Sequence, residues 1–181
     1  MKKMSTRMVV EAGIMIALAQ VLSYFKVYES PYGGSVTAGS MIPIVIFAIR
    51  WGSKPGLLAG LVFGILQFLL GPKYSYHPLS ILLDYLLPFA SIGLAGLFKK
   101  NLATNLVSTF IAMFARFMFH FASGFIVWAS TTPEGQNVYL YSLVYNASYM
   151  LPEFVISAIL LSLLYVPLKR FILENRLRTE A

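Results

Sequence analysis

Ionisable side chains within apolar stretches are the residues of this chain best suited to bind a ligand. Asp84 stands in the stretch SILLDYLLPFASIG, and Arg116, His120 and Glu153 occur in two later apolar runs. An ionised group at the centre of a membrane span costs at least ~2.5 to 3.5 kcal/mol on insertion scales, so such groups tend to face a bundle interior and to serve a function. We therefore expect these four residues to mark a polar site inside a helix bundle.

The patterns of common catalytic and metal sites are absent from the sequence. It contains no HExxH, P-loop or GxSxG motif and no second membrane carboxylate near Asp84 that would form an acid–base pair. The chain has only two histidines, His77 and His120, and no cysteine, which argues against a metal site and excludes disulfides and thiol nucleophiles. The sequence predicts binding without a cofactor, and a membrane enzyme is the weaker alternative.

One stretch of the chain places four functional side-chain types on a single helix face. Arg116, His120, Gly124 and Trp128 follow one another at four-residue intervals, and residues four apart lie one above the other on a helix. This face carries a cation, an imidazole, a gap and a large ring. We expect it to line a ligand site together with Asp84.

Aromatic residues gather in the same part of the sequence and have two interpretations. Rings of this kind form belts at membrane interfaces, and they also form cages in which ring faces attract a planar cation while a carboxylate supplies charge. Asp84 beside Tyr85, with Asn146 as the most notable neutral polar side chain nearby, favours a cage. The rings concerned are Tyr74, Tyr85, Trp128, Tyr139, Tyr141, Tyr145 and Tyr149.

Arg116 has two candidate partners. Arg116 and Glu153 both fall near the predicted membrane midplane, so they form one conceivable ion pair. Alternatively, Arg116 reaches Asp84 and holds it ionised, as an opposite charge within ~4 to 6 Å does. We favour Asp84, because an orienting cation is a common support for a ligand-binding carboxylate.

The composition identifies the elements that must position these residues as membrane spans. The 181 residues are 58% hydrophobic and only 12% charged, with a mean hydropathy of +0.73, whereas soluble chains carry roughly twice that share of charge. Apolar runs recur at lengths near the ~20 residues that cross a bilayer. We predict one all-α integral membrane domain, residues 1–181, with six spans at about 8–25, 38–50, 55–72, 79–98, 104–129 and 139–168.

The basic residues predict the orientation of these spans. The net charge is +7, but the basic residues form short clusters between apolar runs, which argues against nucleic acid as a partner. Cytoplasmic loops are enriched in Lys and Arg, so we expect both termini in the cytoplasm and the basic N-terminal segment to lead into a retained first span. Eleven of the fourteen basic residues then lie inside: Lys2, Lys3, Arg7, Arg50, Lys54, Lys99, Lys100, Lys169, Arg170, Arg176 and Arg178.

Glycines and other small residues mark a turn and two close-packing faces. The first outer loop, KVYESPYGGSVTAG, combines Pro31 with two glycines, which favours tight turns; it is either a lid or a plain connector. Gly56, Gly60 and Gly64 recur at four-residue intervals on the third span, a pattern that usually serves internal helix packing.

The ordered motifs PYGGS, LLDY, FHFASGFIVW and YSLVYN on six spans resemble the thiamine-specific substrate-binding (S) component of energy-coupling factor vitamin transporters. The similarity extends over nearly the whole chain. It implies a high-affinity thiamine binder of the bacterial plasma membrane that docks with a transmembrane coupling protein and two ATP-binding subunits. A self-sufficient small transporter or channel for another organic cation or vitamin is the alternative.

The resemblance also implies roles for individual residues. The family's acidic ligand falls on Asp84, where some members carry glutamate, and a further acidic residue near Ala38 is missing here. Phe63 replaces a tryptophan of some members, and Gly124 leaves room for the ligand. The full implied site comprises Phe63, Tyr74, Asp84, Tyr85, His120, Gly124, Trp128, Tyr141 and Asn146, with Arg116 behind it and the small-residue docking face at Gly13 and Ala17.

Overall fold

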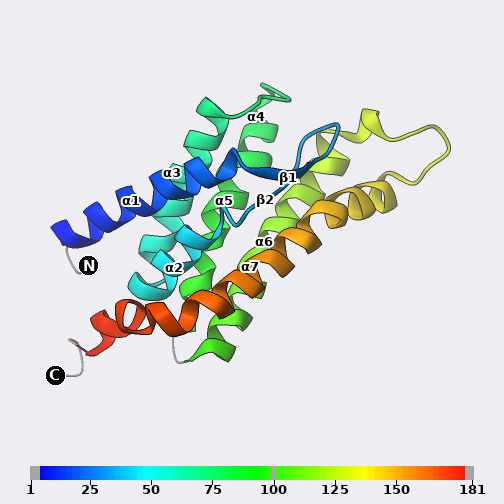
Figure 1. Cartoon of the computed structure of the whole chain (residues 1–181). Coiled ribbons are helices and arrows are strands. Elements are labelled where there is room, and N and C mark those ends of the chain that lie inside the picture. The colour runs from blue at the N-terminus through cyan, green and yellow to red at the C-terminus, as the bar shows by residue number, and fades with distance from the viewer. Residues whose placement is uncertain (1–4, 99–100, 178–181) are drawn as a thin grey trace.

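The computed structural model of the chain describes residues 5–98 and 101–177, which form an almost entirely helical bundle (Figure 1). Five helical segments are long and apolar enough to cross a membrane, and one shorter apolar helix accompanies them. The predicted helical membrane fold is confirmed. The principal helices are α1 (Thr6–Ser23), α2 (Ile42–Trp51), α3 (Ser53–Leu70), α6 (Leu102–Ile126) and α7 (Val138–Leu177), with a composite span at Pro78–Gly96.

Helix α2 differs from the predicted second span because it is too short to cross a bilayer. Its ten residues extend about 15 Å, against a hydrocarbon thickness of ~30 Å. Residues Ile42–Arg50 are buried throughout, and the strands β1 (Lys26–Glu29) and β2 (Ser35–Thr37) precede them in the chain. Extended backbone at membrane depth is tolerated where protein covers it, and α2 is therefore a core helix that follows a hairpin.

The strands β1 and β2 form an antiparallel hairpin that the sequence did not predict. The tight turn favoured by the glycines does form: Ser30 donates its backbone N–H to Gly34, and Gly33 donates to Ser30. Gly33 and Gly34 have φ angles of 98° and 89°, which non-glycine residues rarely adopt. The sequence signal for the turn was thus sound, although it did not reveal the strands.

The composite fourth span is irregular at the position of Asp84. It runs through α4 (Pro78–Ser80), a π-helical turn at Ile81–Leu86, α5 (Leu87–Ser91) and a 3₁₀ turn at Ile92–Gly96. Pro88 has no N–H to donate to the carbonyl of Asp84, four residues earlier, and proline rings crowd that carbonyl. The N–H of Leu87 donates instead to Leu82, five residues back, so Pro88 accounts for the wide turn that carries Asp84.

A cluster of polar and aromatic side chains ties α1, α2 and α7 together. Glu11 accepts hydrogen bonds from Arg50 Nε at 2.7 Å, Trp51 Nε1 at 2.7 Å and Arg7 Nε at 2.9 Å. The guanidinium of Arg50 also lies 4.0 Å from the ring centroid of Phe171. These contacts stabilise the end of the bundle where α1 begins and α7 ends (Figure 1).

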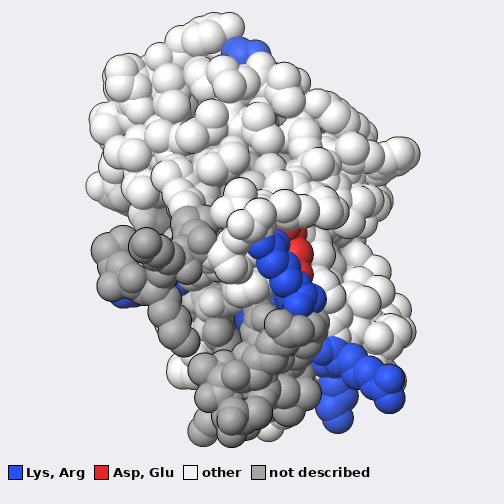
Figure 2. All heavy atoms as spheres, turned by 90° about the vertical axis from the view of Figure 1, so that its left-hand side faces the viewer, with Lys and Arg blue, Asp and Glu red and all other residues white. Residues whose placement is uncertain are grey.

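Basic side chains gather on this end of the molecule, with little acidic surface among them (Figure 2). The start of α1, the joint between α2 and α3 and the end of α7 all lie here. The first turn of α1 and the last turn of α7 therefore lie at the same end of the bundle (Figure 1). Five of the predicted cytoplasmic residues, Lys2, Lys3, Lys99, Lys100 and Arg178, lie outside the described residues.

The glycine face of α3 packs against the composite fourth span, as its spacing predicted. A Cβ placed on Gly60 would lie 2.2 Å from the carbonyl oxygen of Phe89, and one on Gly64 would lie 2.5 Å from that of Tyr85. A Cβ on Gly56 would lie 3.0 Å from the Cα of Gly93. These glycines hold the fourth span close to α3.

We expect Gly60→Ala to lower the thermal stability of the purified protein, because the new methyl group forces α3 and the fourth span apart. Overpacking of this kind costs typically about 1 to 3 kcal/mol. Gly13→Ala is the matched control, since a Cβ there would meet nothing within 4 Å and alanine is the better helix former. Equal melting temperatures for the two variants would contradict this account of the glycine face.

Candidate functional site

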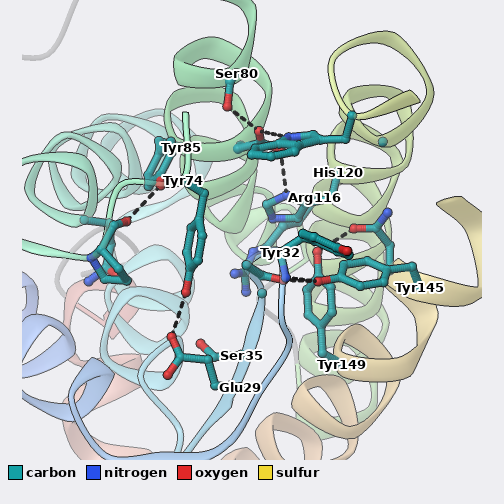
Figure 3. A pocket seen from close by; sticks show the side chains of 18 of the residues that line it. Glu29, Tyr32, Ser35, Tyr74, Ser80, Tyr85, Arg116, His120, Tyr145 and Tyr149 are labelled. Carbon is teal, nitrogen blue, oxygen red and sulfur yellow. Dashed lines mark hydrogen bonds and ion pairs between the residues drawn. The ribbon is translucent and has the colours of Figure 1, made fainter. Parts of the chain in front are cut away.

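A cavity lies between the hairpin, the fourth span, α6 and α7 (Figure 3). Eight of the nine predicted site residues line it, together with Arg116. The structure therefore brings together side chains from segments that are far apart in the sequence. The lining predicted residues are Tyr74, Asp84, Tyr85, His120, Gly124, Trp128, Tyr141 and Asn146.

The carboxylate of Asp84 is held by three side chains. Its Oδ2 accepts hydrogen bonds from Ser80 Oγ at 2.7 Å and from Trp128 Nε1 at 3.1 Å. Its Oδ1 lies 3.5 Å from His120 Nδ1. Ser80 lies one turn before Asp84. His120 lies on α6, and Trp128 lies two residues after the end of that helix. Two residues of the predicted stripe, His120 and Trp128, thus reach Asp84.

Arg116 pairs neither with Asp84 nor with Glu153. Within the described part of the chain it has no ion pair; its guanidinium carbon lies 4.7 Å from the ring centroid of Phe89, and its Nε and Nη1 atoms have no hydrogen-bond partner. The predicted Arg116–Asp84 contact is wrong because His120, one turn nearer on the same helix, meets that carboxylate. Arg116 lines the same cavity.

Glu153 fastens the hairpin to α7. One carboxylate oxygen accepts from the backbone N–H of Thr37 at 2.6 Å, and the other accepts from its hydroxyl at 2.8 Å. Glu153 is only 1% exposed, so both hydrogen bonds are shielded from water. The buried carboxylate is therefore satisfied by the hairpin.

The α7 wall is a chain of hydrogen bonds. Tyr149 donates its hydroxyl to Asn146 Oδ1 at 2.5 Å, and Asn146 Nδ2 donates to the carbonyl of Ser142 at 2.8 Å. A Cβ on Gly124 would lie 2.0 Å from Ser142 Oγ. Gly124 lines the cavity, but the space beside it is taken by Ser142, so its small size serves the close approach of α6 and α7.

Phe63 is the one predicted site residue that does not line the cavity. It is fully buried, and its ring centroid lies 5.1 Å from that of Phe89 in an edge-to-face arrangement. Phe89 itself lines the cavity. Because the glycine face of α3 turns Phe63 toward the fourth span, Phe63 supports the wall from behind and Phe89 forms it.

The hairpin covers the cavity, and most of its contributions were missed by sequence reasoning. Tyr145 donates its hydroxyl to the carbonyl of Gly33 at 2.9 Å and accepts from the backbone N–H of Tyr32 at 2.9 Å. A Cβ on Gly34 would lie 2.5 Å from the ring of Tyr149. The Pro–Gly–Gly pattern was the available signal, and the structure shows that this segment packs on α7 as a roof.

An ionic cluster lies at the more exposed end of the cavity. Glu29 accepts from Lys26 Nζ at 2.6 Å. It also accepts from the Tyr74 hydroxyl at 2.8 Å (Figure 3). The hydrogen bond from Lys26, followed by that from Tyr74, holds the pKa of Glu29 below its usual value. Burial and the hydrogen bond to Glu29 raise the pKa of Tyr74 to about 12. Near neutral pH, Glu29 is therefore ionised and Tyr74 is neutral.

The cavity combines one oriented carboxylate, donors without a partner among the described residues and several aromatic rings, which suits a planar cationic ligand. The described residues contain no group of three potential metal-ligating side chains. A family model for the thiamine transporter protein family (Thia_YuaJ) matches residues 9–173. The chain belongs to this thiamine transporter family.

Individual relatives agree with this family membership. The chain is 38% identical to the thiamine transporter ThiT of Bacillus subtilis (strain 168), with 92% of this chain and 94% of that protein covered. It is 30% identical to ThiT of Lacticaseibacillus paracasei, over 86% and 85% of the two chains. The structure of ThiT from Listeria monocytogenes matches with a TM-score of 0.79 at 29% identity, covering 91% of this chain and 96% of that one. A thiamine transporter with these apolar helices is a multi-pass protein of the bacterial cell membrane, and transport is its activity.

We expect Gly34→Ala to weaken thiamine binding about tenfold, because the new methyl group displaces the hairpin roof from Tyr149. The measurement is a calorimetric titration of the purified protein. Gly135→Ala is the matched control: Gly135 also has a positive φ, of 79°, but a Cβ there would meet nothing within 4 Å. If both variants bind thiamine equally well, the roof does not contribute to the site.

Proposed function

We propose that the chain is the high-affinity thiamine-binding S component of an energy-coupling factor transporter. It captures thiamine from outside the cell and passes it on through a coupling protein driven by two separate ATP-binding subunits. The observation that carries this proposal is the roofed cavity around Asp84, whose carboxylate is already oriented by Ser80, His120 and Trp128.

The chemistry of thiamine fits the groups in this cavity. Its aminopyrimidine offers an amino group to Asp84 and ring nitrogens to donors such as Asn146. His120 Nε2 and two nitrogens of Arg116 have no partner among the described residues, and both residues line the cavity. The permanent charge of the thiazolium suits the faces of Trp128 and the tyrosines. Phe63 supports this site without touching the ligand.

The packing between the cavity and α2 favours binding over conduction. A self-sufficient transporter or channel needs a water path to both sides of the membrane. Below the cavity, Phe89 packs on the fully buried Phe63, and α2 is buried along nearly its whole length. This packing supports a binding subunit that depends on partners to complete transport.

The exposed face of α1 supports docking to the coupling protein. Gly13 and Ala17 are both exposed, one turn apart, and a Cβ on Gly13 would have open space around it. Small residues let a partner helix approach closely within a bilayer. The basic residues at the same end as the start of α1 support a cytoplasmic position for both helical ends.

We expect Asp84→Asn to weaken thiamine binding by about 2 to 3 kcal/mol, because the amide keeps the shape but removes the charge that faces a cation in a dry site. Calorimetry measures the affinity, and the melting temperature without ligand reports on folding. Glu134→Gln, an acidic residue in the outer loop, is the control. Unchanged affinity together with a loss of stability would make Asp84 a structural residue instead.

We expect Gly13→Trp and Ala17→Trp to leave thiamine binding intact and to abolish uptake into cells, because each fills the docking face. Val107→Trp is the matched control, since Val107 is a 52% exposed apolar residue on α6 and a tryptophan there faces the bilayer without touching α1. Persistent uptake with both α1 variants would place the docking face elsewhere.

A further inference from the structure

The two ends of the cavity differ in exposure and in charge. At the inner end, Asn146 and Arg116 are 5% and 6% exposed. At the outer end, the side chains of Lys26 and Glu29 are 27% and 43% exposed. Both outer residues lie on β1 and line the cavity, yet they carry opposite charges. The mouth therefore presents an acid and a base to whatever part of a ligand reaches it.

The orientation of the ligand determines which part reaches the mouth. This step rests on the proposed function. The aminopyrimidine needs several donors and acceptors at once, and Asp84, His120 and Asn146 supply them at the inner end. The hydroxyethyl arm on the thiazolium then points outward, and it is the arm that carries the phosphate in phosphate esters of thiamine. A phosphate is strongly hydrated and favours the exposed end of a site.

Lys26 and Glu29 act in opposite directions on the two forms of the ligand. The Lys26 ammonium attracts a phosphate monoester, which carries about −1.5 to −2 charge at pH 7, and repels the thiazolium. The Glu29 carboxylate does the reverse. If the Lys26 ammonium moves from Glu29 to a ligand phosphate, Glu29 still accepts the hydrogen bond from the Tyr74 hydroxyl at 2.8 Å. Lys26 is therefore able to bind a phosphate without disrupting the roof.

We propose that the Lys26–Glu29 pair on β1 sets the selectivity of the site between thiamine and its phosphate esters. Lys26 is the determinant that admits the ester, and Glu29 is the determinant that favours the free cation. The pair is a specificity device at the mouth, distinct from the aromatic and carboxylate contacts at the inner end of the cavity.

The test is a set of calorimetric titrations of the full chain with thiamine and with thiamine monophosphate. We expect Lys26→Gln to lower the ratio of ester affinity to thiamine affinity, and Glu29→Gln to raise it, each by about twofold to fivefold, as for partly exposed charge pairs. The Glu29→Gln amide keeps the side-chain length, and its oxygen still accepts from the Tyr74 hydroxyl. The Lys26→Gln effect should shrink as salt is raised.

Two control variants each remove one charge outside the cavity, one from a lysine and one from a glutamate. Lys73→Gln removes a cation that donates to the carbonyl of Leu69 and does not line the cavity, and Glu134→Gln removes an acid from the outer loop. Both should leave the affinity ratio unchanged. Equal ratios in wild type, Lys26→Gln and Glu29→Gln would overturn the selectivity proposal, as would an ester that binds neither wild type nor Glu29→Gln. Failure of wild type to bind thiamine would instead refute the proposed function.

Discussion

A single carboxylate in an apolar span is the constraint on which the rest of the site depends. An ionised Asp84 must be compensated, and three donors are arranged around it. Pro88 widens the helix at this point into a π turn, a geometry that is frequent at functional sites. The packing of α3 against this irregular span then fixes its position, because the glycines of α3 leave no room for displacement.

Helix α7 joins the binding cavity to its roof. Tyr145, Tyr149 and Glu153 lie on successive turns of this helix, and each contacts the hairpin or the residues at its base. Asn146 on the same helix faces the cavity and is oriented by Tyr149. A ligand that contacts Asn146 therefore lies next to the side chains that hold the hairpin, so ligand binding and the position of the roof are mechanically linked through α7.

The sequence predicted features that follow from helical periodicity and failed where long-range packing decides. The stripe of Arg116, His120 and Gly124 was predictable because residues four apart share a face. The partner of Asp84 was not, because only the folded bundle shows that His120 and Trp128 reach this carboxylate before Arg116 does. Phe63 was misplaced although a signal existed: it lies three residues after Gly60 and one before Gly64, on the face that packs against the fourth span.

The hairpin shows the same limit. Pro31 and the two glycines predicted its turn. The hairpin and α7, however, are in contact through residues more than 100 positions apart in the sequence. Glu29 and Lys26 thus gave no sign that they reach the cavity. No local pattern distinguishes a lid from a connector when the contacts that decide it come from a distant helix.

Binding of thiamine beside Asp84 is tested most directly by titrating the purified Trp51→Phe variant with thiamine and recording its tryptophan fluorescence. The chain has two tryptophans, so Trp128, whose indole donates to Asp84, is then the sole reporter. We expect strong, saturable quenching by thiamine, because the ligand lies against this ring. Folded protein that shows no quenching and no heat of binding with thiamine would contradict it.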